Sequence, residues 1–217
     1  MERNEVRITG RIDEDIQLIA DAAEWGRKLY ETKISTARYS GVEDVLILQF
    51  PAAAVGTGKE LKAIGKGARV KLTGEIRTEN EKEIVATKPS VKIFVYASSV
   101  ELAEETEEDV NEVILGGNIC KETVPRKTPK GTSVTDVIVA AGTGKPAFVP
   151  CVCWCEVAEA AADLTKGTYV EVEGRIQSRE FKKHVKGSDV PFLLTAYEVS
   201  VVEMRAEVEE AEEGDGK

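Results

Sequence analysis

The chain has 217 residues, 42% of them hydrophobic, which is enough for the cores of one large or two small domains. Its 39 acidic residues outnumber its 29 basic ones, so the overall charge of −10 excludes a uniformly basic surface. No apolar run approaches the roughly 18 residues that a membrane span needs, and the N-terminal residues lack the pattern of a signal peptide. We therefore expect a cytoplasmic protein.

The excess negative charge is confined to two short stretches. Residues 1–103 hold 16 basic and 16 acidic side chains, and residues 111–205 hold 12 of each. Residues 104–110 carry five acids and no base, and residues 206–217 carry six acids and one lysine. The pattern predicts two neutral domains, an acidic linker between them and an acidic, disordered C-terminal tail. A neutral domain can still present a basic face.

Two motifs recur in the same order in both halves of the chain. Residues 4–12 and 111–119 share Asn-Glu-Val followed by Gly-x-Ile. Residues 66–76 and 166–176 share Lys-Gly-x-x-Val-x-x-x-Gly-x-Ile. Two matches in the same order predict a duplicated fold of about 100 residues per copy.

Each copy is expected to consist mainly of strands. In the first half a short helix is expected at residues 60–64, and the strands should follow the order of the second half. There, β-rich runs bounded by glycine, proline or charged turns are expected at residues 113–119, 134–140, 148–155, 169–179 and 193–202. A helix is expected at residues 156–164. Five strands with one helix after the third is the order of an OB-fold, so we predict an all-β chain of two tandem five-stranded OB-fold barrels, each with one short helix.

The motifs of the second half occur in a specific order. NEVILGGNI is followed by Arg126-x-Thr128-Pro129-x-Gly131, and then by FVPCVCW, KGTYVEVEGRIQSREF and TAYEVSV. This order resembles the bacterial single-stranded DNA-binding protein family over residues 111–205, and the first half, with GEIRTE in place of GRIQSR, looks like a divergent copy. The resemblance implies sequence-independent binding and protection of single-stranded DNA in replication, recombination or repair, in association with the nucleoid. It also implies oligomers of about four barrels, which a tandem chain would reach as a homodimer.

Side chains alternate along the strand at residues 148–155. Phe148, Val152 and Trp154 should share one face, and Val149 should share the other with the three cysteines Cys151, Cys153 and Cys155. The cysteine face suits the barrel core, which leaves Phe148 and Trp154 outward as platforms on which bases stack. Packing of these aromatics at a barrel end or a dimer interface is the alternative. We expect the cysteines to be reduced core thiols, because C-x-C-x-C with His184 as the single histidine is a weak zinc signal; no metal and no cofactor is expected.

Basic side chains extend the expected DNA-binding face. On the strand at residues 169–181, Val170, Val172 and Ile176 should point inward, while Arg175, Arg179 and Phe181 point outward. Lysines follow in the next hairpin, and a second basic cluster follows the first strand of this half. The alternative interpretation is a solvated charged surface. Glu171 and Glu173 share the outward face and weaken the prediction of DNA contact at that end of the strand. The residues expected to contact single-stranded DNA are Phe148, Trp154, Arg175, Arg179, Phe181, Lys182, Lys183, Arg126, Lys127 and Lys130.

The first half has fewer such features. A basic and aromatic patch comprises Trp25, Arg27, Lys28 and Tyr30, and Glu75 stands at the position of Arg175. Four further aromatics are expected in the core, namely Tyr39, Phe50, Phe94 and Tyr96. We expect this domain to serve mainly assembly, with an auxiliary role in DNA binding.

The chain departs from the family pattern in two places, and one alternative function remains open. The segment AAGTGKPA at residues 140–147 lacks the aromatic or arginine usual in the family, and the tail ends in Gly-Asp-Gly-Lys rather than a hydrophobic residue, which leaves recruitment of replication or repair enzymes uncertain. The two GTGK segments do not fit a phosphate loop, and a single histidine offers no nucleophilic constellation, so we expect no enzyme. The alternative function is an OB-fold assembly or primosome-type adaptor with weak affinity for DNA.

Overall fold

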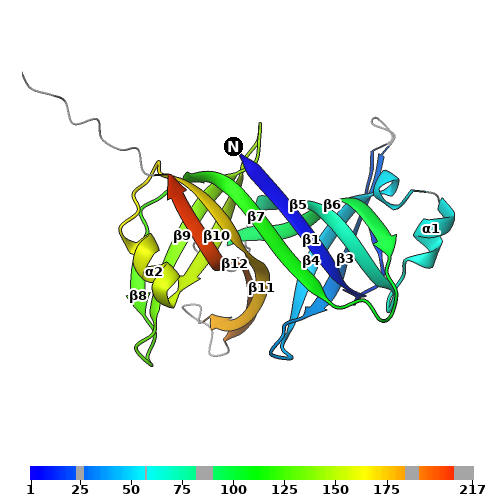
Figure 1. Ribbon diagram of the computed structural model, residues 1–217. Coiled ribbons are helices and arrows are strands. Elements are labelled where there is room, and N and C mark those ends of the chain that lie inside the picture. The colour runs from blue at the N-terminus through cyan, green and yellow to red at the C-terminus, as the bar shows by residue number, and fades with distance from the viewer. Residues whose placement is uncertain (23–26, 57, 82–89, 184–190, 208–217) are drawn as a thin grey trace, which may run out of the picture.

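The computed structural model describes residues 1–22, 27–56, 58–81, 90–183 and 191–207 (Figure 1). The first half contains β1 (Arg3–Ile12), β2 (Gln17–Ala22), β3 (Arg27–Ala37), β4 (Glu43–Pro51), the 3-10 helix η1 (Ala52–Val55), α1 (Gly58–Ala63), β5 (Arg69–Glu81) and β6 (Ser90–Leu102). The second half contains β7 (Val110–Ile119), β8 (Val124–Lys127), β9 (Ser133–Ala141), β10 (Ala147–Trp154), α2 (Cys155–Ala162), β11 (Tyr169–Lys183) and β12 (Phe192–Glu207). Within these ranges no helix is long and apolar enough to cross a bilayer.

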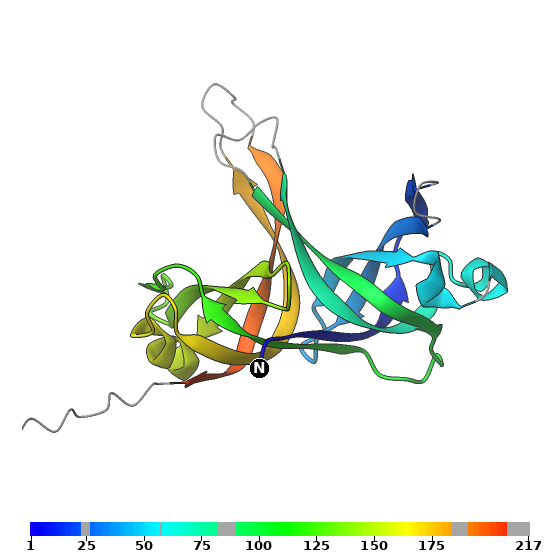
Figure 2. The same cartoon turned by 90° about the horizontal axis from the view of Figure 1, so that it is seen from above.

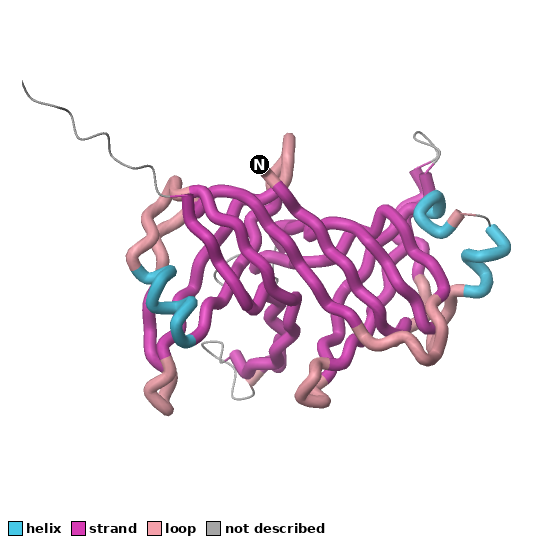
Figure 3. Tube along the Cα trace, viewed as in Figure 1, coloured by secondary structure: helices cyan, strands magenta, loops and turns pink. Residues whose placement is uncertain are grey.

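The expected pair of barrels is confirmed, with one strand more in each than the sequence predicted. The added strands, β2 and β8, are the outermost strands of a sheet whose order is β2-β3-β4-β6-β5-β1-β7-β11-β12-β10-β9-β8. Pairing of β1 with β3 closes the first barrel, and pairing of β7 with β9 closes the second. The helices α1 and α2 lie at opposite ends of the molecule (Figure 3).

One antiparallel pairing, between β1 and β7, joins the two barrels. Its register runs from Arg3 opposite Gly116 to Thr9 opposite Val110. Val6 lies opposite Val113 at the centre, and these two valines are equivalent positions of the sequence repeat. Both are buried. The two barrels are therefore related by an approximate two-fold axis at this pair.

The repeated glycines mark places where two backbones approach closely. A Cβ atom at Gly117 would lie 2.0 Å from the carbonyl oxygen of Ala140, and one at Gly174 would lie 2.4 Å from that of Ser200. The equivalent glycines of the first barrel, Gly10 and Gly74, are as close to carbonyl oxygens of β3 and β6. Any side chain here would push strands apart, which explains why both copies keep glycine.

The repeated asparagines extend the ladder where two strands separate. β5 stops pairing with β1 at Gly74, and from there the side chain of Asn4 accepts a hydrogen bond from the Ile76 N–H (2.9 Å) and donates one to the Ile76 carbonyl (2.8 Å). Asn111 makes the same two bonds to Ile176, at 3.0 and 2.7 Å. Each asparagine side chain thus makes the two hydrogen bonds that a backbone residue of a paired strand would make.

The hairpins β5–β6 and β11–β12 lie across one another between the barrels (Figure 2). Ile93 and Phe94 from one hairpin and Ile176 and Tyr197 from the other line the same small apolar space, together with Leu46. The crossing therefore adds a hydrophobic contact to the β1–β7 seam and fixes the angle between the barrels.

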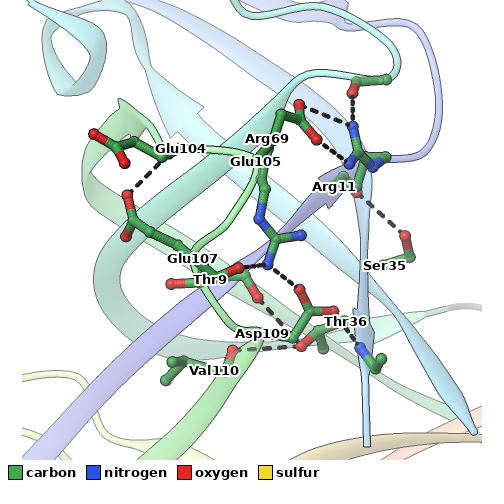
Figure 4. Close-up of polar contacts among 12 residues, drawn as sticks. Thr9, Arg11, Ser35, Thr36, Arg69, Glu104, Glu105, Glu107, Asp109 and Val110 are labelled. Carbon is green, nitrogen blue, oxygen red and sulfur yellow. Dashed lines mark hydrogen bonds and ion pairs between the residues drawn. The ribbon is translucent and has the colours of Figure 1, made fainter. Parts of the chain in front are cut away.

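The acidic segment 104–110 is held against the first barrel (Figure 4). Arg11 pairs with Glu105 at 2.6 Å, and Arg69 pairs with Asp109 at 2.5 Å. The second carboxylate oxygen of Asp109 accepts the Ala37 N–H at 2.6 Å. The segment, expected as a plain acidic linker, thus places its charges on basic groups of the first barrel and leads directly into β7.

The cysteines of β10 follow the predicted alternation up to the end of the strand. Cys151 and Cys153 are buried, and burial raises the pKa of the Cys151 thiol and raises that of Cys153 to about 12. The prediction for Cys155 was wrong. This residue is exposed, because the chain turns into α2 there with a left-handed φ of 53°. Among the described residues no group of histidine, cysteine or acidic side chains is arranged to hold a metal ion.

Replacing Asp109 with alanine should lower the free energy of unfolding by about 2–3 kcal/mol, because Arg69 would lose its charged partner in a partly buried site. The side chain of Arg69 is only 10% exposed. The measurement is urea unfolding followed by circular dichroism. Glu105→Ala, which removes an exposed partner of Arg11, is the control and should change the midpoint much less; equal losses would contradict this account.

In the native protein Cys155 should react rapidly with iodoacetamide, whereas Cys151 and Cys153 should react only after unfolding. Their burial and raised pKa values leave almost no accessible thiolate at neutral pH. Peptide mass spectrometry after timed labelling distinguishes the sites. Labelling of Cys153 as fast as that of Cys155 would show that the core side of β10 is not closed.

Candidate nucleic-acid interface

Side chains of five strands line up on the outward side of the second barrel, although two of them, Val152 and Ser200, are buried. A single cross-strand row runs from Val124 on β8 through Asp136, Val152 and Ser200 to Arg175 on β11. Side chains directly opposite each other project from the same side of a sheet. The row therefore places side chains from distant parts of the sequence on one face, which we call the β10 face.

The two predicted aromatic platforms lie on the β10 face. Phe148 is 51% exposed and Trp154 is 37% exposed. They are six residues apart on one strand, about 20 Å. Val152 has the same orientation by alternation but is buried, so the aromatics are the exposed apolar groups at either end of the strand. This spacing suits several nucleotides of an extended strand.

Arg126 lies in the same cross-strand row as Trp154, with one strand between them. It pairs with Val134 across β8 and β9, and Val134 in turn pairs with Trp154. Its guanidinium makes two hydrogen bonds to the carboxylate of Asp136, at 2.8 and 2.9 Å. These bonds are the main reason why the pKa of Arg126 is raised. Arg126 is therefore already neutralised by a protein carboxylate.

Arg175 has the opposite environment. It is half-buried, and within the described part of the chain its guanidinium makes no hydrogen bond or ion pair, with its Nε buried and unsatisfied. A buried donor without an acceptor costs free energy. Arg179 lies 4.0 Å from Glu198 and 5.7 Å from the ring of Phe181. Of these arginines, Arg175 is the one whose geometry calls for an external anion.

The remaining predicted residues are spread around this centre. Lys127, at the end of β8, and Lys130, in the following turn, are exposed. Phe181 and Lys182 lie on the part of the β11–β12 hairpin that projects from the barrel (Figure 2). The side chain of Lys183 is outside the described residues. The structure thus groups Trp154, Arg126 and Arg175 and separates the hairpin residues from them.

The predictions for the first barrel were mixed. Phe50 and Phe94 are core residues, as expected, and Tyr30 stacks on Phe50 at 5.7 Å. Tyr39 is fully exposed in the turn between β3 and β4, so its assignment to the core was wrong. Tyr96 was also assigned to the core but is only half-buried. Trp25 and the side chain of Arg27 are outside the described residues.

A groove between the barrels was not predicted. It has a volume of about 460 Å³ and is lined by Arg77, Thr78 and Tyr96 of the first barrel and by residues 141–147 of the second. The Arg77 guanidinium lies over the ring of Tyr96, 3.4 Å from its centre. The sequence offered no signal for this groove, because its walls come from segments that meet only when β1 pairs with β7.

Comparison with known proteins supports the interpretation of the second half. Residues 110–206 match the model of the Single-strand binding protein family. "Single-stranded DNA-binding protein 2" of Listeria innocua is 35% identical over 82 residues, covering 34% of this chain and 52% of that protein. The "Single-stranded DNA-binding protein" of Oceanobacillus iheyensis is 34% identical over 82 residues, covering 34% and 51%. The chain spans about half the length of these relatives.

The fold of the whole chain has a counterpart among solved structures. The wild-type single-stranded DNA binding protein from Thermus aquaticus superimposes with a TM-score of 0.75 over 97% of this chain and 95% of that chain, at 18% identity. A deletion mutant of the same protein gives 0.74. At this identity the likeness concerns the fold. The resemblance expected from the motifs is therefore confirmed for the second half, where residues 110–206 match the family model, and the whole chain shares the tandem-barrel fold of the Thermus aquaticus protein.

Proposed function

We propose that this chain binds single-stranded DNA without sequence preference and protects it during replication, recombination or repair. The observation that carries the proposal is the β10 face, which bears two exposed aromatic side chains and an arginine that has no hydrogen-bond or ion-pair partner among the described residues. The names of the relatives of residues 110–206 point in the same direction.

Stacking supplies the part of the binding energy that depends on unpaired bases. Exposed aromatic rings accept any base, because every base has a π-face, and each stacked base contributes about 1–3 kcal/mol. Phe148 and Trp154 are exposed although both are large and apolar, which costs hydration free energy in the unbound protein. Covering them with bases would recover that free energy.

Phosphate contacts supply the part of the binding energy that depends on salt concentration. Arg175 offers an unpaired guanidinium on the same face, and Lys127, Lys130 and Lys182 are exposed around it. Each phosphate neutralised releases counterions from the strand. Arg126 contributes less in this proposal, because Asp136 already accepts two of its N–H groups.

The remaining assignments belong to the same proposal. Residues 111–205 act as the main DNA-binding domain, and residues 1–103 act mainly in assembly. Two copies of the chain form a homodimer that brings four barrels together in the cytoplasm, and the protein performs no catalysis. The residues proposed to contact DNA stay those predicted from the sequence, with Trp154, Phe148 and Arg175 as the centre.

The purified protein should bind a labelled oligo-dT more tightly than a duplex of the same length, because stacking requires unpaired bases. Its affinity should fall as salt rises, through counterion release. Fluorescence anisotropy at several salt concentrations measures both. Equal or tighter binding of the duplex would contradict the proposal, and no binding of oligo-dT at low salt would favour the assembly adaptor instead.

Arg175→Ala should weaken binding of every single-stranded sequence alike and reduce the slope of log K against log salt by about 0.7, the value of one phosphate contact. Arg126→Ala is the matched control on the same face, and its slope should change less because Asp136 already neutralises the guanidinium. The measurement is an anisotropy titration of both variants over a salt series. A larger change of slope for Arg126→Ala than for Arg175→Ala would contradict the proposal, because it would show that Arg126 makes the phosphate contact.

A further inference from the structure

We propose that the groove between the barrels is a second nucleotide-binding site, where a base stacks on the Arg77–Tyr96 pair of the first barrel and a phosphate contacts Lys145 of the second. This inference rests on the proposed binding of single-stranded DNA. It assigns the auxiliary role of the first barrel to particular residues, and it gives a role to the turn at residues 142–146 of the second barrel, which lacks the aromatic or arginine usual in the family.

The platform is a preformed stack. The Arg77 guanidinium lies over the Tyr96 ring, 3.4 Å from its centre, and its Nε donates to the Glu75 carboxylate at 2.7 Å, which holds the group in place over the ring. The Arg77 side chain remains 47% exposed. Bases stack on guanidinium planes as they do on aromatic rings. A base entering the groove would therefore meet an ordered planar surface that already has a ring beneath it.

The opposite wall of the groove supplies a positive charge. Residues Thr143, Lys145 and Pro146 of the β9–β10 turn line it, and Lys145 is exposed. Gly142 of this turn lies close to the side chain of Asn4, which is itself held by its two hydrogen bonds to Ile76. Glu79 lies on the Arg77 wall and would repel a phosphate there. The phosphate of a bound nucleotide is therefore expected on the Lys145 side.

The groove adjoins the first residues of β10, next to Phe148 of the β10 face. The backbone N–H of Phe148 donates to the Thr78 hydroxyl at 3.2 Å, and Thr78 and Ala147, the neighbours of Arg77 and Phe148, both line the groove. A strand stacked on Phe148 thus reaches the Arg77–Tyr96 pair by continuing across the boundary between the barrels. The site would extend the length of DNA bound by one chain.

The equivalent place in the second barrel lacks the platform. Glu75 pairs with Tyr96 across β5 and β6, whereas Arg175 pairs with Ser200 across β11 and β12. Serine offers no ring, and the approximate two-fold symmetry is broken at this position. The aromatic member of the pair therefore belongs to the first barrel alone, which gives a bound strand a defined direction of extension.

The test compares a short oligo-dT of about 8 nucleotides, within the roughly 4–16 that one OB-fold accommodates, with a long one of about 30. Tyr96→Ala should lower affinity for the long oligonucleotide about fivefold or more, the effect of losing one stacked base, and leave the short one unchanged. Tyr96→Phe keeps the ring and should retain affinity. Lys145→Gln, on an exposed turn, should weaken the long complex and lower its salt slope, whereas Lys66→Gln, an exposed lysine beyond α1, should not.

Trp154→Ala, on the β10 face, should weaken both oligonucleotides. If Trp154→Ala weakens binding while Tyr96→Ala and Lys145→Gln leave the ratio of long to short affinity at the wild-type value, the groove is not a nucleotide site and the proposed function stands. If the wild-type protein binds neither oligonucleotide at low salt, both proposals are overturned. Circular dichroism of each variant verifies the fold, and Lys145→Gln tests the groove independently should Tyr96→Ala unfold.

Discussion

The pairing of β1 with β7 determines where every functional surface of this protein lies. A barrel built from one copy of the repeat would leave the outer edge of β1 or β7 unpaired, with a row of free backbone donors and acceptors. Here the two edges satisfy each other around Val6 and Val113. The hairpins then cross and pack through Ile93 and Ile176. Because the seam and the crossing set the angle between the barrels, the turn at residues 142–146 faces β5 and β6 of the other barrel, and the inter-barrel groove forms.

The acidic side chains of segment 104–110 are kept away from the proposed DNA-binding face. The acids of segment 104–110 lie against Arg11 and Arg69 of the first barrel, on basic groups that take no part in the proposed binding. On the β10 face Arg175 has no charged partner within the described part of the chain, and its buried Nε makes no hydrogen bond there. The overall charge of −10 is therefore a poor guide to the affinity of this protein for a polyanion.

The sequence was sufficient for features that depend on local pattern. Alternation along residues 148–154 placed Phe148 and Trp154 outward, and the repeats identified two barrels, because glycines at close backbone approaches and asparagines that extend a ladder tolerate little substitution. Prediction from the sequence failed where the chain changes direction or contacts a distant segment. Cys155 left the core because the strand ended one residue earlier than alternation assumed.

Contacts between side chains on separate strands could not be predicted from local pattern either. Nothing in the order of residues shows that Arg77 stacks on Tyr96 or that Asp136 neutralises Arg126, since each pair joins separate strands. The acidic segment was recognised as a boundary, but its partners on the first barrel were not. Such interactions depend on the register of the strands, which cannot be deduced from the order of residues alone.

The most direct test of the central claim is photochemical crosslinking of a bromodeoxyuridine-substituted single strand to the protein, with the attached residues identified by mass spectrometry. A strand that lies on the β10 face should crosslink to Trp154 or Phe148. Crosslinks confined to the β1–β7 seam or to the helices at the two ends would contradict the account, because those surfaces lie away from the face on which the proposed function rests.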